Sequence, residues 1–311
     1  MNGIEKYDLT KEEFENSLKM AELALLMRVR PSDEPKSIFI ISQAGGGKTG
    51  LKTFVENENY KGQENIFVEI NPDEVAIYHK YYENIMKEYP KQSHTQIQKF
   101  VRPALDDYLR KRAVQFRTNI IQEGTFGSTD GYLKILDFQK NGGKAAIGPL
   151  ESNGERKEID IDGGYNIEID ILAVDRYESL LSSYEREQYF IETGLSPRAV
   201  TAENHDRAYE NLIKTVQEIE NRKLYNRMRV FKRGKIETEP ELIYISDEGK
   251  YNSVADCIQE VRNEERKKII KNSKKYLKRI QNLKQRVLDK NLIEKIEVLE
   301  REFLKELAQE R

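Results

Sequence analysis

Residues Ile38–Thr49 read IFIISQAGGGKT, a β-branched and aromatic run that stops in three glycines and is followed by Lys48 and Thr49. The pattern predicts a strand, a phosphate-binding loop and the start of a helix. A loop that wraps a triphosphate points several backbone N–H groups inward, and residues without a Cβ adopt those conformations most easily. The glycines that meet this need are Gly45, Gly46 and Gly47. Lys48 would bring a positive charge to the β- and γ-phosphates, and Thr49 would offer its hydroxyl to Mg²⁺.

One position departs from the phosphate-loop pattern. G-x-x-x-x-G-K-[ST] begins with glycine, whereas this chain has Ser42 at that place. The alternative interpretation is a glycine-rich turn before a helix, with no ligand. Gly-Lys-Thr directly after an apolar strand favours nucleotide binding over that alternative.

Composition limits the class of protein. The chain has 311 residues, enough for one large domain or two, and 34% of them are charged, which is typical of a soluble protein with many solvated helical faces. A net charge of −2 gives no reason to expect nucleic acid or a membrane as partner. No apolar run reaches the roughly 18 residues of a membrane span, and we expect a cytoplasmic protein. The single cysteine, Cys257, excludes an intrachain disulfide.

Strand candidates alternate with helical segments along the chain, which predicts an α/β fold with a mostly parallel sheet flanked by helices. Thr10 and Glu13 have capping-box spacing and open an amphipathic helix that reaches Leu26. The strand candidates after the loop are Asn65–Ile70, Asn119–Gln122, Ile167–Val174, Arg227–Phe231 and Leu242–Ile245. The helices predicted between them include Leu51–Asn57, Tyr132–Lys140, Tyr177–Thr193 and Ala202–Arg222.

Two further segments stand out. Asn153-Gly154 lies between alternating apolar segments, which predicts a β-hairpin over Ala145–Ile161. Ser253–Arg311 is helical in pattern throughout, and two apolar stripes separated near Asp289 predict two antiparallel helices. Its basic stretch, residues 262–286, is either a solvated helix face or a surface for a partner or nucleic acid. The lack of interleaved aromatic residues favours the solvated face.

The position of the next carboxylate decides what kind of phosphate-loop protein this is. ATPases of the motor type place Asp-Glu at the end of a later strand, whereas small-molecule kinases often place one just after the second strand. Asp73 follows the second strand directly, and the carboxyl ends of parallel strands share one edge of a sheet, so Asp73 should lie near Lys48. There it could accept a proton from an attacking alcohol. The alternative is that Asp73 only caps the next helix.

Other polar residues follow the third and fourth strands. Glu123 and Thr125 end the third strand at the same edge, where they could bind substrate or water on Mg²⁺, or merely form a turn. Arg186 and Arg198 follow the fourth strand, where they could neutralise charge on a moving phosphoryl group or lie on the surface. Asp175 is interpreted as a helix cap because no second acidic residue follows it at once.

The ordered motifs resemble those of the zeta toxin family of bacterial toxin–antitoxin systems, which are P-loop kinases. The resemblance covers roughly residues 5–285, and single motifs carry less weight than their order and spacing. The segments that carry it are FENSL, SQAGGGKT, INPDE, QEGTFG, YERE, SPRAVTAENHD, RVFKRG and NSVADCIQE.

The resemblance implies transfer of the γ-phosphate of ATP to the 3′-hydroxyl of the amino sugar in UDP-N-acetylglucosamine, which blocks cell-wall synthesis. It implies ATP and Mg²⁺ as cofactors and a small helical antitoxin that blocks the ATP site. Asp73 would be the general base, with Lys48 and Thr49 handling phosphates and metal. The remaining matches are Glu123 and Thr125 for sugar or metal, Arg186 and Arg198 for the γ-phosphate, and a substrate-binding acid at Asp107 or its neighbour Asp106.

Departures from the family leave other functions open. Arginines common in the family after the base and after the EGT motif are replaced by Ala76 and Gly127. A kinase of another nucleotide sugar or small metabolite therefore stays possible, as does a non-catalytic, nucleotide-dependent interaction module. We expect a kinase-like domain over residues 1–252, with a hairpin insertion at about 144–163, and a C-terminal helical segment over 253–311 that packs on or extends it.

Overall fold

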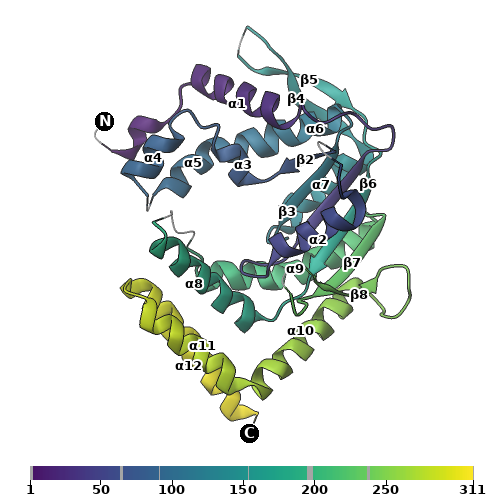
Figure 1. The fold of residues 1–311 in the computed structure, drawn as a ribbon. Coiled ribbons are helices and arrows are strands. Elements are labelled where there is room, and N and C mark those ends of the chain that lie inside the picture. The colour runs from purple at the N-terminus through teal and green to yellow at the C-terminus, as the bar shows by residue number, and fades with distance from the viewer. Residues whose placement is uncertain are drawn as a thin grey trace.

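The structure, a computed structural model, describes residues 3–63, 66–90, 92–152, 154–194, 199–236 and 239–310. Within these residues a six-stranded sheet forms the centre, in the order β2-β3-β1-β6-β7-β8 (Figure 1). All neighbours pair in parallel except β7 and β8. The predicted α/β fold with a mostly parallel sheet is confirmed. The strands are β1 Lys36–Ile41, β2 Phe67–Ile70, β3 Asn119–Gly124, β6 Asn166–Leu172, β7 Arg227–Lys232 and β8 Glu241–Ile245.

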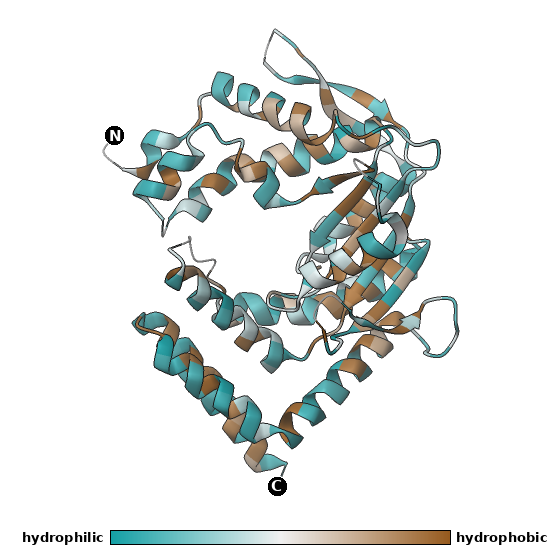
Figure 2. Cartoon of the chain, viewed as in Figure 1, coloured by the Kyte–Doolittle hydropathy of each residue, from teal (hydrophilic) through white to brown (hydrophobic). Residues whose placement is uncertain are grey.

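Helices cover both faces of the sheet, and β1 at its centre is apolar on both sides. Alternate side chains of a strand point to opposite faces. Ile38 and Ile40 of β1 pack with α2, whereas Phe39 and Ile41 join the larger core to which α7, α9 and α10 contribute. Figure 2 shows hydrophobic residues, in brown, along the central strands. No helix in the described part of the chain is long and apolar enough to cross a membrane.

The helices that precede the C-terminal segment follow the sequence pattern closely, and α1 begins with the predicted capping box at Thr10 and Glu13. The start predicted for the second strand, Asn65, lies outside the described residues. The α-helices are α1 Lys11–Leu25, α2 Lys48–Tyr60, α3 Pro72–Ala76, α4 Tyr82–Glu88, α5 Ser93–Arg102, α6 Arg110–Gln115, α7 Thr129–Asn141, α8 Arg176–Glu192 and α9 Ala202–Arg222. A short 3₁₀-helix, η1, spans Ile4–Tyr7, and a π-helical turn, η2, spans Pro103–Leu109.

The predicted hairpin is present as a separate two-stranded antiparallel sheet of β4 (Gly143–Leu150) and β5 (Arg156–Ile161). Its tip residue Asn153 lies outside the described residues. The hairpin contacts α1: Lys11 Nζ donates to the carbonyl oxygen of Gly154 at 2.6 Å, and Arg156 pairs with Glu15.

The prediction of two antiparallel helices in the C-terminal segment is wrong. The segment forms three helices: α10 Val254–Lys271, α11 Ser273–Arg286 and α12 Lys290–Gln309. The extra break falls at Asn272, whose backbone leaves the helical conformation (φ −104°, ψ 29°) and whose Nδ2 donates to the carbonyl of Lys268 at 2.8 Å. The chain turns there because α10 packs into the main core through Ile258 and Val261, while α11 packs elsewhere.

Helices α11 and α12 form a C-terminal hairpin that packs against α8 around a second core (Figure 1). Aromatic rings lie at its centre: the Phe303 ring is 5.2 Å from that of Tyr177 and 4.5 Å from that of Tyr276. The buried members of this core are Tyr177, Leu180, Leu181, Tyr184, Tyr276, Ile280, Leu283, Val287, Leu292, Ile296, Leu299 and Phe303. The C-terminal hairpin therefore shares a hydrophobic core with α8.

Phe303→Ala tests how much this second core contributes to stability. Phe303 is fully buried, and truncation of a buried phenylalanine leaves a cavity, so the free energy of unfolding should fall by about 3–5 kcal/mol. Urea denaturation followed by circular dichroism measures the loss. Leu288→Ala is the matched control in the same hairpin, because Leu288 is 92% exposed and its truncation should change stability by less than about 0.5 kcal/mol. Equal losses in the two variants would contradict the packing described.

Candidate active site

The loop between β1 and α2 has the backbone of a phosphate-binding loop. Gly45 and Gly47 adopt left-handed conformations, with φ of 70° and 98°, that favour glycine. A Cβ on Gly45 would lie 1.9 Å from the carbonyl oxygen of Ser179, so the loop also presses closely on α8. The N-terminus of α2 follows at once, beginning at Lys48. Loop amides and helix terminus thus converge where an anion would bind.

Ser42, the departure from the glycine pattern, is fully buried and anchors the loop. Its Oγ donates to the carbonyl oxygen of Leu172 on β6 at 2.8 Å. A Cβ on Gly46 would lie 2.0 Å from the same Oγ, so the serine and this glycine fit each other. The side chain at position 42 therefore points into the protein between two strands, and the loop keeps its form.

Lys48 lies beneath the loop, where its Nζ donates to the carbonyl oxygens of Ser42 at 2.9 Å and Gln43 at 3.3 Å. Loss of hydration lowers the pKa of Lys48 to about 8; the nearby Glu123 carboxylate opposes this shift and the Arg186 guanidinium adds to it. Burial also raises the pKa of Glu123. The charges of Glu123 and Arg186 therefore both act on Lys48, as expected of residues around one site.

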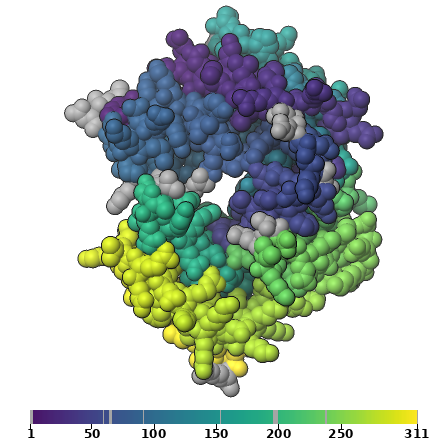
Figure 3. Space-filling model, viewed as in Figure 1, coloured from purple at the N-terminus to yellow at the C-terminus, as the bar shows by residue number. Residues whose placement is uncertain are grey.

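A cavity of about 480 Å³ opens beside the loop. Figure 3 shows a hollow between the blue N-terminal helices, α2 and the green α8. Five cationic side chains and two carboxylates line the cavity, an excess of positive charge that suits a polyphosphate. The lining residues are Gly45, Gly47, Lys48, Thr49, Glu123, Glu178, Ser182, Arg186, Arg233, Gly234, Lys235 and Arg279. Six residues predicted from the sequence are therefore brought together: Gly45, Gly47, Lys48, Thr49, Glu123 and Arg186.

Asp73 lies in the first turn of α3, exposed to solvent and off the wall of this cavity. The residue that caps α3 is Asn71, whose Oδ1 accepts from the backbone N–H of Asp73 at 3.0 Å, so the alternative that Asp73 is the cap is wrong. The carboxylates of Glu69 and Asp73 add to the burial that raises the pKa of Glu123. Asp73 is thus near the site, with its side chain not used for capping.

Thr125 follows β3 in a turn. Its backbone N–H donates to Tyr132 Oη at 3.3 Å, and its Oγ1 accepts from the N–H of Gly127 at 3.3 Å. A Cβ on Gly127 would meet Thr125 Oγ1 at 3.2 Å, so this position has little room for a side chain. Thr125 therefore lies in a turn, as one of the two interpretations held. That it also binds substrate stays a prediction.

The two candidate substrate acids, Asp106 and Asp107, lie on η2 and border a separate cavity of about 370 Å³ between η2, α6 and α7. Asp106 pairs with Arg110 at 2.9 Å. Arg198 lies outside the described residues. Asp175 is the predicted cap of α8: its Oδ1 accepts from the N–H of Tyr177 at 2.8 Å.

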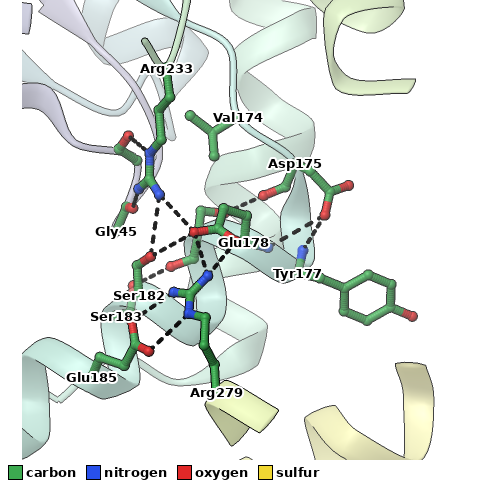
Figure 4. A network of polar contacts seen from close by, with 12 residues as sticks. Gly45, Val174, Asp175, Tyr177, Glu178, Ser182, Ser183, Glu185, Arg233 and Arg279 are labelled. Carbon is green, nitrogen blue, oxygen red and sulfur yellow. Dashed lines mark hydrogen bonds and ion pairs between the residues drawn. The ribbon is translucent and has the colours of Figure 1, made fainter. Parts of the chain in front are cut away.

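Sequence reasoning missed Arg233, although it belongs to the quoted RVFKRG segment. Its Nε donates to the carbonyl oxygen of Gly46 at 3.0 Å, its Nη2 to that of Gly45, and its Nη1 to Glu178 at 2.9 Å (Figure 4). It follows β7 at the carboxyl edge of the sheet, so the rule that located Asp73 could also have located it.

The basic C-terminal stretch is not simply a solvated face, and that interpretation needs correction. Arg262 is 1% exposed, lies 3.7 Å from the Tyr209 ring, and donates to Gln43 Oε1 at 3.3 Å. Arg266 pairs with Asp175 at 2.6 Å, and Arg279 lines the cavity. These arginines turn inward because α10 and α11 pack on the elements around the loop.

Comparison with known proteins shows the family of the chain. The sequence model of the family described as Zeta toxin matches residues 23–147 and 152–239. The chain belongs to the zeta toxin family. It is 25% identical over 259 residues to Toxin PezT of Streptococcus pneumoniae, covering 83% of this chain and 90% of that toxin. It is 23% identical over 230 residues to Toxin zeta of Streptococcus pyogenes, covering 73% of this chain and 70% of that toxin.

A solved structure from a study of the PezAT chromosomal toxin–antitoxin system of Streptococcus pneumoniae has a similar fold. Its TM-score is 0.62 at 21% sequence identity, and the match covers 89% of this chain and 98% of that one. The resemblance to zeta toxins drawn from the motifs is therefore confirmed. The matched segments include the phosphate-binding loop, Asp73, Glu123 and Arg233, whereas α10–α12 follow the last matched residue.

Proposed function

We propose that this zeta toxin family member is an ATP-dependent toxin kinase that phosphorylates the 3′-hydroxyl of the amino sugar of UDP-N-acetylglucosamine and so blocks cell-wall synthesis. The observation that carries the proposal is the cation-rich cavity on which the glycine loop, Lys48, Glu123 and Arg186 converge. Such a cavity suits the triphosphate of the phosphate donor, and positioned cations stabilise the charge of a phosphoryl group in transfer.

The residues predicted from the sequence take the following roles in this reaction. Asp73 accepts the proton of the attacking hydroxyl, because its carboxylate lies near Glu123 and is not used as a cap. Arg186 and, by the family resemblance, Arg198 neutralise charge on the transferred group. Thr49 would hold Mg²⁺ together with phosphate oxygens, since it lies on the cavity wall and Mg²⁺ needs few protein ligands. When bound, the ion supplies charge neutralisation at the phosphates.

We assign the second cavity, between η2, α6 and α7, to the acceptor. Arg110, Lys111 and Lys134 border the second cavity together with Asp107, the proposed substrate-binding acid. Tyr132, from the same helix α7, contacts Thr125 at the end of β3. Arg110 is paired with Asp106, so Lys111 and Lys134 are the cations that support binding of a diphosphate sugar despite Ala76 and Gly127, where the family commonly has arginines.

The test of the acceptor is a product assay over a panel of nucleotide sugars. The protein is incubated with Mg·ATP and each sugar, and mass spectrometry records which one gains a phosphate. UDP-N-acetylglucosamine should be phosphorylated fastest. Faster phosphorylation of another nucleotide sugar would show that the proposed acceptor is wrong and that the proposed kinase activity is right. ATP binding with no phosphorylated product over the whole panel would favour the non-catalytic module.

The pKa of about 8 at Lys48 predicts a pH dependence of nucleotide binding. A triphosphate binds the charged ammonium, so affinity should be constant below the pKa and fall as pH rises through it, by up to about tenfold per pH unit. Calorimetric titration with ATP between pH 7.5 and 9.5 measures the slope, a range that flanks the pKa of about 8. Lys48→Met is the matched control, because it carries no titrating group and its weaker binding should show no such step.

We further propose a helical antitoxin as partner. Helix α1 buries Leu18 and Ala21 in the core, which confirms that it packs within the protein. Its other side exposes Met20 and Leu23, with Met27 just beyond its end, at 59%, 49% and 54%. These residues recur at helical spacing and form an apolar stripe that suits a partner helix.

A further inference from the structure

The C-terminal hairpin, α11 and α12, packs on the helix that forms one wall of the nucleotide cavity. Helix α8 lines that cavity with Glu178, Ser182 and Arg186, which recur every four residues and so share one face of the helix. Tyr177, Leu181 and other residues of α8 are buried against the hairpin. The hairpin and the phosphate-binding loop are therefore separated by the width of a single helix.

Arg279 reaches from α11 to the cavity wall. Its Nη1 donates to both oxygens of Glu178, at 2.9 Å and 2.7 Å, while its Nε and Nη2 bind Glu185 at 3.2 Å and 2.8 Å. Bidentate pairs of this kind fix geometry as well as charge. Arg279 is thus held by two carboxylates of α8 and borders the cavity from outside the residues that match the family's sequence model.

Glu178 joins Arg279 to the loop. The carboxylate accepts from Arg233 Nη1 at 2.9 Å, and Arg233 also donates to the carbonyl oxygens of Gly45 and Gly46. Figure 4 shows this chain of contacts running from α11 through α8 to the loop. Glu178 is one of two carboxylates that line the cavity, and the other charged side chains on its wall are cationic.

An uncompensated carboxylate in a polyphosphate site would oppose binding, because like charges repel and a partly enclosed site screens them poorly. Glu178 pairs with two arginines. Arg233 supplies the first positive charge but is shared with two loop carbonyls, and Arg279 supplies the second. The ion pair between Arg279 and Glu178 therefore preserves the positive character of the cavity and holds Glu178 in place.

We propose that Arg279 is a positioning residue of the nucleotide site: it neutralises Glu178, and it makes the C-terminal hairpin part of the machinery that binds the nucleoside triphosphate. This inference rests on the proposed nucleotide binding. It assigns a function to a segment that follows the last residue matched by the family's sequence model, and it implies that the C-terminal hairpin and the loop are coupled through one carboxylate.

The test is a double-mutant cycle, in which the two charges are removed singly and together, read out by ATP affinity. Arg279→Ala should weaken ATP binding about tenfold or more, and the loss should shrink as salt rises. In the double variant Arg279→Ala with Glu178→Gln, affinity should return to within about threefold of Glu178→Gln alone, since the carboxylate that Arg279 neutralises is gone. Removal of a merely structural tie would not be rescued in this way.

Arg286→Ala is the matched control. Arg286 is on the same helix and pairs with Glu192 of α8, but away from the cavity, so ATP affinity should not change. Thermal unfolding of each variant checks that the C-terminal hairpin remains docked. Arg279→Ala that binds ATP like the unaltered chain, or a double variant as weak as Arg279→Ala, would overturn this inference alone. Unaltered protein that binds no ATP would overturn both this inference and the proposed function.

Discussion

Asp73→Asn is expected to lower the rate of phosphate transfer by about 10²–10⁴ while ATP affinity stays nearly unchanged. The amide keeps the shape of the side chain but cannot accept the proton of the attacking hydroxyl. Asp73 lies off the wall of the nucleotide cavity, so its loss should not disturb binding of the phosphate donor. Single-turnover kinetics with the acceptor sugar, together with calorimetric titration of ATP, separate the two quantities.

Glu74→Gln provides the control for that variant. Glu74 is the next residue, is also exposed, and lies in the same first turn of α3, so any general effect of removing a charge from this helix would appear in both variants. Transfer at the normal rate is expected in Glu74→Gln. Full activity in Asp73→Asn would show that another group is the base.

Lys48→Ala is expected to impair both ATP binding and transfer. The ammonium donates to two loop carbonyls and lies at the N-terminus of α2, beside the place where the phosphates would bind. Removal of one charged donor from a phosphoryl-transfer site lowers turnover by about 10²–10³. Growth of cells that express the variant should be unaffected, in contrast to cells that express the unaltered toxin.

The exposed Lys61, at the end of the same helix, supplies the comparison for Lys48. Lys61→Ala should retain ATP affinity, transfer and toxicity. Toxicity that persists in Lys48→Ala would mean that phosphoryl transfer is not its cause.

Much of the fold follows from the sequence because local signals and tertiary structure agree. The apolar run of β1 is buried on both faces, and Gly45 and Gly47 after it adopt the left-handed conformations that the loop requires. The edge rule for parallel strands placed Glu123 correctly beside Lys48, and it would have placed Arg233 had the end of β7 been read in the same way.

The parts that escaped prediction depend on contacts between distant segments. The apolar stripe over α10 and α11 is continuous in sequence, and only the two different cores that it meets explain the turn at Asn272. Arg279 resembles any charged residue of a solvated helix until that turn brings it to Glu178. The pattern of residues along the sequence does not show which core each helix will meet, or that Arg279 will meet Glu178.

The measurement that tests the account most directly is the mass of UDP-N-acetylglucosamine after incubation with the protein and Mg·ATP. We predict a gain of one phosphate group on the sugar nucleotide, dependent on protein, on ATP and on Asp73. An unchanged mass, under conditions in which ATP is shown to bind, would contradict the assignment of this cavity to a sugar-nucleotide kinase.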